Sequence, residues 1–203
     1  EKIHKLIANA QAQKHALMQQ LLPQGLHAPR KRLRGFSAPL TATTIAKMGQ
    51  VSSGGTPDSA SPDCWGGTIA WATPTDITKL RSRHIHQTER SLTALGLSSS
   101  SAKVVPIGSI IVCTRATIGE LAIAAALMTT NQGFKNIVPN SKHNSDFIYY
   151  LLAHNKKALV RAAGGSTFAE ISKADFEKLA FLIPAIDEQK SIATVLINAD
   201  EAI

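Results

Sequence analysis

Both ends of the chain carry the same pattern of apolar and polar positions. Apolar residues recur in alternating steps of three and four, the heptad spacing of a helix that packs on a partner helix. The positions are Ile3, Ile7, Ala10, Leu17 and Leu21 at the start and Ile192, Leu196, Ala199 and Ile203 at the end. If Glu1 is placed directly after Ile203, the step from Ile203 to Ile3 is three, so the alternation continues through the join. The pattern therefore predicts two half-helices of one repeating unit, over residues 1–22 and 186–203.

If the two segments form one seam, the chain should dimerise or pair its terminal helices with another copy. The residues expected to pair are Ile3, Ile7, Leu17, Leu21, Ile192, Leu196 and Ile203. Two unrelated amphipathic helices on the surface of a globule are the alternative.

Between residues 23 and 185 the pattern changes to short apolar runs separated by turns, typical of a mixed domain. Glycine, serine, proline and aspartate crowd residues 51–67, which predicts a long exposed loop. Strands are predicted at 68–71, 110–114, 121–126, 136–138 and 179–183. One helix is predicted over 145–163, capped by Asn144 or Ser145, and a short one over 173–178, before Asp187 caps the last helix. The fold class is therefore α/β (mixed α+β), strand- and loop-rich, flanked by long coiled-coil-forming helices.

The composition is that of an ordinary globular domain. The chain has 203 residues, 44% of them hydrophobic, which is enough for one domain with its own core. Cys64 and Cys113 lie far apart, and reduced thiols are the simplest account of them. No apolar run is long enough to span a bilayer, since the candidate at 118–128 is short and contains Glu120. We therefore expect a cytoplasmic protein that does not contact a membrane.

The positive charge is concentrated near the N-terminus. The formal net charge is +8, and six of these charges arise within the first 34 residues. Arg30, Lys31, Arg32 and Arg34 follow Pro23, Gly25 and Pro29, so they lie in a linker after the first helix. The linker is either a solvated segment or a strap that contacts nucleic-acid phosphates.

Familiar catalytic motifs are missing from the 203 residues: there is no GxxxxGK[ST], no GxGxxG after a strand and no HExxH. His84 and His86 could share one face of a strand, but no third metal ligand is near in sequence. A magnesium-dependent nuclease would need Asp58 or Asp63, in a flexible loop, to meet Glu188 at a helix start. We therefore expect no catalytic residues, no metal site and no enzyme activity.

Four polar loops remain as candidates for binding. They span residues 52–56, 114–119, 129–135 and 164–168 and combine glycine with hydroxyl, amide or basic side chains. Such groups reach base edges and phosphates in DNA complexes. Tight turns are the better explanation of Gly108, Gly119 and Gly133. Together with the basic linker, the loops favour nucleic-acid binding.

A series of short motifs connects these loops along the chain. The motifs are Gly54-Gly-Thr-Pro57, Trp65-Gly66, Ile69-x-Trp71, Ser101-Ala-Lys103, Pro106-x-Gly-Ser109, Thr114-Arg-Ala-Thr-Ile-Gly119, Thr130-Asn-Gln-Gly-Phe-Lys135 and Gly165-Ser-Thr167. As an ordered set they closely resemble the target recognition domain of type I restriction-modification specificity (S) subunits. The ending Ile183-Pro184 with Glu188-Gln189-x-x-Ile192-Ala193 and Asp200 is similar to the start of that family's conserved spacer helix, and Leu17-Met-Gln-Gln-Leu-Leu22 to the end of one.

The resemblance implies a non-catalytic subunit whose recognition domain, residues 23–185, reads one half of a bipartite double-stranded DNA target. The helices would set the distance to the other half and dock methyltransferase subunits, and a motor-nuclease subunit would complete the complex. S-adenosylmethionine, magnesium and ATP would belong to the partner subunits, so no cofactor is expected here. A full S subunit has two recognition domains, and this chain holds one. It is either a fragment of a longer subunit or a half-length subunit that dimerises.

Candidate DNA contacts are the polar and basic residues of the loops, the linker and one helix start. They are Arg30, Lys31, Arg32, Arg34, Ser53, Thr56, Arg81, Arg83, Arg115, Thr117, Lys135, Ser166, Thr167 and Lys173. The linker cations suit phosphates, while Arg115 suits a guanine edge or an internal pair with Glu120. The alternatives are a methyltransferase or nuclease fragment with its own active site, and a coiled-coil assembly module that does not bind DNA.

Overall fold

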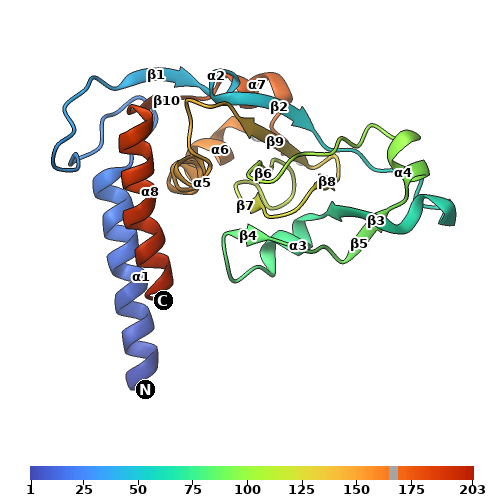
Figure 1. Ribbon diagram of the computed structural model, residues 1–203, viewed down its shortest axis with the longest axis horizontal. Helices are drawn as coiled ribbons and strands as arrows, with labels where there is room; N and C mark the ends of the chain where they lie inside the picture. The colour runs from blue at the N-terminus through green and yellow to red at the C-terminus, as the bar shows by residue number, and fades with distance from the viewer. Residues whose placement is uncertain (165–168) are drawn as a thin grey trace.

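Two long helices leave a mixed domain side by side in the computed structural model, which describes residues 1–164 and 169–203 (Figure 1). Helix α1 (Lys2–Leu21) runs towards the domain and helix α8 (Ile186–Glu201) runs back from it, so the two are antiparallel. This pair is termed the helical arm. The combination of a strand- and loop-rich mixed domain with two long flanking helices confirms the predicted fold class.

The arm is part of the core near the domain and is exposed at its far tip. Leu21, Ile192 and Leu196 are buried in the main hydrophobic core. At the tip Ile3 is 71% and Ile203 42% exposed, because the first turns of α1 extend beyond the end of α8. The arm therefore divides into a buried base and an apolar, exposed tip.

The two halves of the predicted seam lie side by side. Their pairing with another copy, which the sequence pattern also indicated, stays a prediction. In the structure the two halves pack against each other within one chain, with Leu17 partly buried beside the core. The reason is the antiparallel direction of α8, which carries its apolar face back along α1.

The described residues of the domain form three sheets. The five-stranded sheet has the order β2 (Gly49–Ser53), β9 (Phe134–Pro139), β6 (Ile110–Cys113), β7 (Leu121–Ala124) and β4 (His84–Ile85). Its neighbouring strands are antiparallel except β4 and β7, which are parallel. The three-stranded sheet has the order β5 (Arg90–Leu92), β3 (Trp65–Ala72) and β8 (Met128–Thr130). The two-stranded sheet pairs β1 (Thr41–Thr44) with β10 (Ala180–Ile183).

Short helices fill the connections, and one longer helix forms the centre of the core. The short ones are α2 (Ile45–Met48), η1 (Pro62–Cys64), α3 (Pro74–Thr78), α4 (Ala94–Ser98), α6 (Lys156–Ala162) and α7 (Lys173–Lys178). Helix α5 (Ser145–His154) contacts α8 and strands β6 and β7. The side chain of Asn144 accepts a hydrogen bond from the backbone N–H of Phe147 at 2.9 Å, which confirms the predicted cap. Within the described residues, no helix is both long and apolar enough to cross a membrane.

Each predicted strand overlaps an observed one, and the short helix at 173–178 is confirmed, but three other expectations were wrong. The helix predicted over 145–163 is broken into α5 and α6 at Asn155. The amide nitrogen of Asn155 donates to the carbonyls of Pro23 (3.0 Å) and Leu151 (2.8 Å), and its oxygen accepts from the backbone N–H of Gly25 (2.9 Å). This residue therefore fastens the segment after α1 to the core, a contact that helical periodicity does not show.

The stretch 51–67 is a loop only in its middle. Val51 is buried and pairs with Ile137 of β9, while Trp65 already belongs to β3. The partner strands supply hydrogen bonds that the glycine- and serine-rich composition does not reveal. Asp187 was expected to cap the last helix, but α8 begins at Ile186 and Asp187 lies in its first turn.

We expect Leu196→Ala to lower the free energy of unfolding by about 2–5 kcal/mol, because Leu196 is fully buried where α8 meets the core. The matched control Ile3→Ala truncates a side chain of similar size at the exposed tip and should change stability by less than about 0.5 kcal/mol. Urea denaturation followed by circular dichroism measures both. Equal losses in the two variants would contradict the division of the arm into base and tip.

Candidate nucleic-acid interface

Three of the polar loops meet at one edge of the five-stranded sheet. Strands β2 and β6 end where β9 begins, since β9 pairs antiparallel with both. The backbone N–H of Gly54 donates to the carbonyl of Phe134 (3.3 Å), and that of Thr114 donates to the carbonyl of Gly133 (2.8 Å). The surface formed in this way, termed the loop edge, comprises residues 53–57, 101–103, 114–117 and 131–133.

Two glycines allow the loops to approach so closely. A Cβ atom on Gly54 would lie 1.9 Å from the carbonyl oxygen of Asn131, and one on Gly55 would lie 2.3 Å from the backbone nitrogen of Ala102. Any side chain at either position would displace backbone, so glycine is required there. The glycine pair therefore brings the 101–103 loop, which comes from a different part of the sequence, onto the loop edge.

Polar side chains are exposed along this edge. Thr56, predicted as a DNA contact, is half-buried, and its hydroxyl hydrogen-bonds to the side-chain oxygen of Gln132. Gln132 and Lys103 are both exposed, although neither was among the predicted contacts. Lys103 ends a serine-rich run before a turn, which was the available signal. Ser53 is half-buried at the end of β2.

Arg115 is the exposed cation at the centre of the predicted loops. Its backbone forms an isolated antiparallel bridge with Glu170, and it directly follows the buried residue Thr114. The internal partner considered for it, Glu120, pairs instead with Lys156 at 2.5 Å. Within residues 1–164 and 169–203, the side chain of Arg115 takes part in none of the ion pairs. An arginine on a fixed backbone with an exposed side chain suits the reading of a base edge.

Two predicted contacts lie beneath this surface. Lys135 is only 4% exposed, and its Nζ lies 3.4 Å from both Thr114 Oγ1 and Glu170 Oε1. Lys135 thus contacts the loop that begins at Thr114 from inside the domain. Its side chain is buried and is therefore not available to DNA. The hydroxyl oxygen of Thr117 is likewise buried, without a hydrogen-bond partner among the described residues.

Of the four linker cations, Arg32 forms an internal ion pair and the other three are exposed. The Nε of Arg32 donates to Glu188 Oε1 at 2.6 Å, a second guanidinium nitrogen pairs with Oε2, and the Glu188 side chain is 1% exposed. These hydrogen bonds raise the pKa of Arg32 above its ordinary value. Arg32, predicted to contact a phosphate, thus forms an internal ion pair in the structure. Arg30, Lys31 and Arg34 are exposed.

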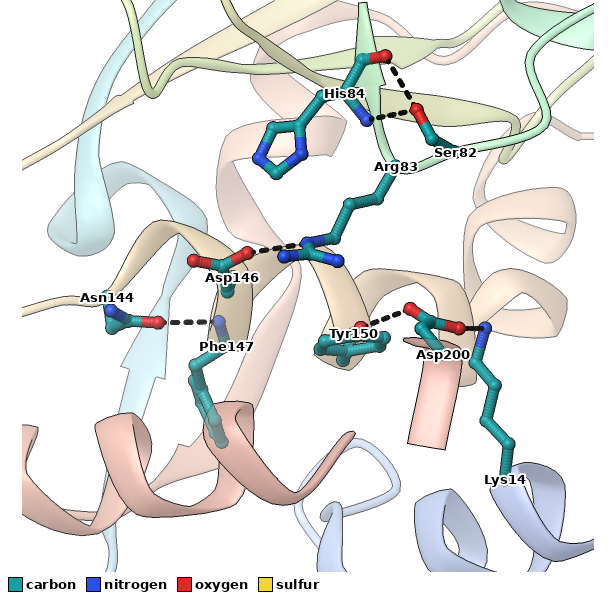
Figure 2. A network of polar contacts seen from close by, with 9 residues as sticks. All are labelled: Lys14, Ser82, Arg83, His84, Asn144, Asp146, Phe147, Tyr150 and Asp200. Carbon is teal, nitrogen blue, oxygen red and sulfur yellow. Dashed lines mark hydrogen bonds and ion pairs between the residues drawn. The ribbon is translucent and has the colours of Figure 1, made fainter. Parts of the chain in front are cut away.

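A second network joins the domain to the arm (Figure 2). Arg83 donates from Nε to Asp146 Oδ1 of α5 at 2.9 Å, so this predicted DNA contact is already occupied. Asp200 of α8 is held by Lys14 of α1 and by the hydroxyl of Tyr150 in α5. Burial, followed by the bond to Asp200, raises the pKa of the Tyr150 phenol, which keeps it protonated as the donor.

The remaining predicted contacts lie away from the loop edge or cannot be placed. Arg81 is exposed and lines a cleft of about 620 Å³ between the arm and the β4 region. Lys173 is the exposed first residue of α7, with its Nζ 3.5 Å from Glu177 Oε1. Ser166 and Thr167 lie outside the described residues.

The described residues do not assemble a metal site. No group of three or more histidine, cysteine, aspartate or glutamate side chains in this part of the chain is placed to hold a metal ion. The rings of His84 and His86 are 6.5 Å apart, and Glu188 is bound by Arg32. Burial raises the pKa of the Cys113 thiol to about 12, so the thiolate does not form near neutral pH.

Comparison with known proteins places residues 41–203 under one family model, described as the type I restriction modification DNA specificity domain. The chain is 37% identical over 161 residues to the MjaIX specificity subunit of Methanocaldococcus jannaschii, covering 78% of this chain and 37% of that protein. It is 27% identical over 164 residues to the EcoR124I/EcoR124II specificity subunit of Escherichia coli, covering 77% of this chain and 40% of that protein. The HsdS subunit from Thermoanaerobacter tengcongensis has the same fold, with a TM-score of 0.70, 15% identity, and coverage of 98% of this chain and 45% of that one. The chain thus spans about two fifths of these curated relatives.

We expect Arg32→Gln to lower the free energy of unfolding by about 3 kcal/mol, because it leaves the buried carboxylate of Glu188 without a counter-charge. Arg34→Gln makes the same chemical change at an exposed position two residues later and should leave stability within about 0.5 kcal/mol. Thermal and urea unfolding measure the difference. If Arg32→Gln is as stable as the wild type, the ion pair with Glu188 does not stabilise the fold, and Arg32 is a free linker cation like Arg34.

Proposed function

Because this chain belongs to the family of type I restriction-modification DNA specificity domains, we propose that it reads one half of a bipartite DNA target and docks methyltransferase subunits through its helical arm. The observation that carries the proposal is the loop edge, where polar loops distant in sequence converge around the exposed Arg115. Base edges are read by such side chains when the backbone beneath them is fixed.

Sequence-independent affinity would come from the linker. Arg30, Lys31 and Arg34 lie at the surface beside the base of the arm, on a segment without regular secondary structure. Cations of this kind contact phosphates, which strengthens binding to any duplex and positions the domain on it. The linker would then contact phosphates, and the loop edge would contact bases.

The helical arm would hold the distance to the second half of the target. That half would be read by a second specificity domain, supplied either by the same longer subunit or by another copy of this chain. The exposed apolar side chains at the tip, among them Ile3, Leu6 and Ile203, offer a surface for a partner helix or a methyltransferase subunit. Methyl transfer and cleavage would then be the work of the methyltransferase and motor-nuclease subunits, which would bind S-adenosylmethionine, magnesium and ATP.

We expect Arg115→Ala to weaken binding to the preferred duplex by about 1–3 kcal/mol while leaving binding to a random-sequence duplex nearly unchanged, because a base contact contributes only where the right base is present. The comparison variant is Arg30→Gln/Lys31→Gln/Arg34→Gln. It should weaken both duplexes alike and flatten the dependence of log affinity on log salt by about 0.9 for each phosphate that is no longer neutralised.

Fluorescence anisotropy at several salt concentrations measures both variants, with the preferred duplex obtained by selection from a random pool. An equal loss on both duplexes for Arg115→Ala would assign this residue to phosphate binding. A large drop in its melting temperature would assign it to the fold.

We also expect no methyl transfer and no DNA cleavage by the purified chain when S-adenosylmethionine and magnesium are supplied. Methylation should appear only when a methyltransferase subunit is added, since the 203 residues carry none of the catalytic motifs considered and no group of metal-holding side chains lies within the described part of the chain. Transfer of a radiolabelled methyl group to duplex DNA is the measurement. Glu188→Ala and Asp63→Ala preparations serve as controls for contaminating enzymes, and reproducible turnover by the chain alone would refute the non-catalytic assignment.

A further inference from the structure

The guanidinium of Arg90 lies over an aromatic ring on the three-stranded sheet. Its guanidinium carbon lies 3.5 Å from the ring centroid of Trp65 and 5.4 Å from that of Trp71. The two indoles meet edge to face, with centroids 4.9 Å apart and an interplanar angle of 77°. Stacking of this kind restrains the plane of the guanidinium.

The local backbone is built to produce this stack. Trp71 and Arg90 are directly opposite each other on the antiparallel strands β3 and β5, so their side chains share one face. Trp65 and Trp71 are six residues apart, so the alternation of side chains along a strand places them on the same face. The irregularity of β3 brings them together along that face: both Trp65 and Ile69 are opposite Leu92, so the chain between them bulges and Trp65 lies beside Trp71.

Glycine is required within the bulge. Gly66 has a φ of +79°, which favours glycine, and a Cβ atom on Gly67 would lie 2.3 Å from the carbonyl oxygen of Leu92. The motif Trp65-Gly66-Gly67 therefore allows the bulge that brings the Trp65 indole beside Trp71 and Arg90, although it places two glycines in a strand.

Both indoles are anchored to the loop that runs into the loop edge. The Nε1 of Trp71 donates to the carbonyl of Gly55 at 2.9 Å, and the Nε1 of Trp65 donates to the carbonyl of Asp58 at 3.0 Å. Gly55 is the residue that packs on the 101–103 loop. The Arg90 stack is thus an extension of the loop edge, on the side of the domain away from the helical arm (Figure 1).

The guanidinium of Arg90 keeps its charge uncompensated within the described part of the chain. The neighbouring Glu89 pairs with Lys79 at 3.5 Å, and Arg90 is in none of the ion pairs formed there. Arg90 is exposed. Its carbonyl accepts a hydrogen bond from the Thr88 hydroxyl at 2.7 Å, which fixes its backbone. A planar guanidinium that has an indole on one side and belongs to an exposed residue is suited to two parallel hydrogen bonds.

We propose that Arg90, oriented by Trp65, is a specificity-determining residue that reads the O6 and N7 acceptors of a guanine in the DNA target. This rests on the proposed function. Arginine bound to guanine through both acceptors is the commonest base-specific contact in the major groove. A phosphate would not require the plane of the guanidinium to be set in advance, and neither would a solvated surface cation. Trp65 is the positioning residue in this arrangement.

The test compares four versions of the full chain in selection from a random-sequence duplex pool, with the methyltransferase subunit present: wild type, Arg90→Lys, Trp65→Leu and Arg161→Lys. Arg90→Lys keeps the charge but removes the planar fork. Arg161→Lys is the matched control, since Arg161 is an exposed arginine on α6. Melting temperatures establish that each variant is folded. Arg90→Lys, at an exposed position, is the variant that keeps the test decisive if Trp65→Leu is destabilised.

We expect Arg90→Lys to lose the preference for guanine at one position of the selected sequence, with binding to the wild-type duplex falling roughly 5- to 100-fold and binding to random duplex unchanged. Trp65→Leu should lose preference at the same position, and Arg161→Lys should select as wild type. An unaltered selection by Arg90→Lys would overturn the proposal, as would an equal loss on all duplexes. If the wild-type chain itself selects no sequence, the proposed function fails first, and the inference falls with it.

Discussion

The antiparallel pairing of β1 with β10 is the constraint on which the rest of the molecule depends, because it places both ends of the mixed domain at one point. Helix α8 follows β10 after two residues, so it must leave the domain there. The chain after α1 is held at the same place: the backbone N–H of Leu182 donates to the carbonyl of Gly25 at 3.0 Å, and Arg32 binds the buried Glu188. With both ends fixed, the two terminal helices lie against each other over the main core.

If the arm acts as the proposed spacer, its attachment to the domain must be rigid, because a spacer sets a distance only when it does not rotate relative to the domain. The contacts of Figure 2 address this directly, since Asp200 of α8 is bound by a residue of α1 and by a residue of α5. The partly exposed Lys14–Asp200 pair alone would contribute little. Its value lies in joining three helices that are already packed, so the network specifies the angle of the arm more than the stability of the domain.

The sequence predicted elements better than partners, for a physical reason. Periodicity and turn composition act locally, so the strands, α7 and the Asn144 cap were recoverable from spacing. Arg32, Arg83 and Lys135 looked like free cations because their acidic partners lie 156, 63 and 35 residues away. The break between α5 and α6 at Asn155 was missed for the same reason, because this residue hydrogen-bonds to a segment 130 residues earlier in the chain. The loop edge itself followed from sequence only in part, since strand register, not loop composition, brought the loops together.

These internal pairs change what the net charge of +8 means. Cations that are bound to carboxylates inside the protein add little to the electrostatic field around it, so under the proposed function the exposed cations would carry the interaction with DNA. They are of two kinds. Those of the linker lie on an irregular segment, which suffices for phosphates. Arg115 and Arg90 instead sit on backbones fixed by strand pairing, and Arg90 is also stacked on an indole. Ordering a long side chain costs conformational entropy, and a protein that meets this cost during folding does not meet it again on binding. We therefore expect glycine bulges and paired tryptophans to support the side chains that discriminate between base sequences. Side chains that bind DNA through charge alone do not need such support.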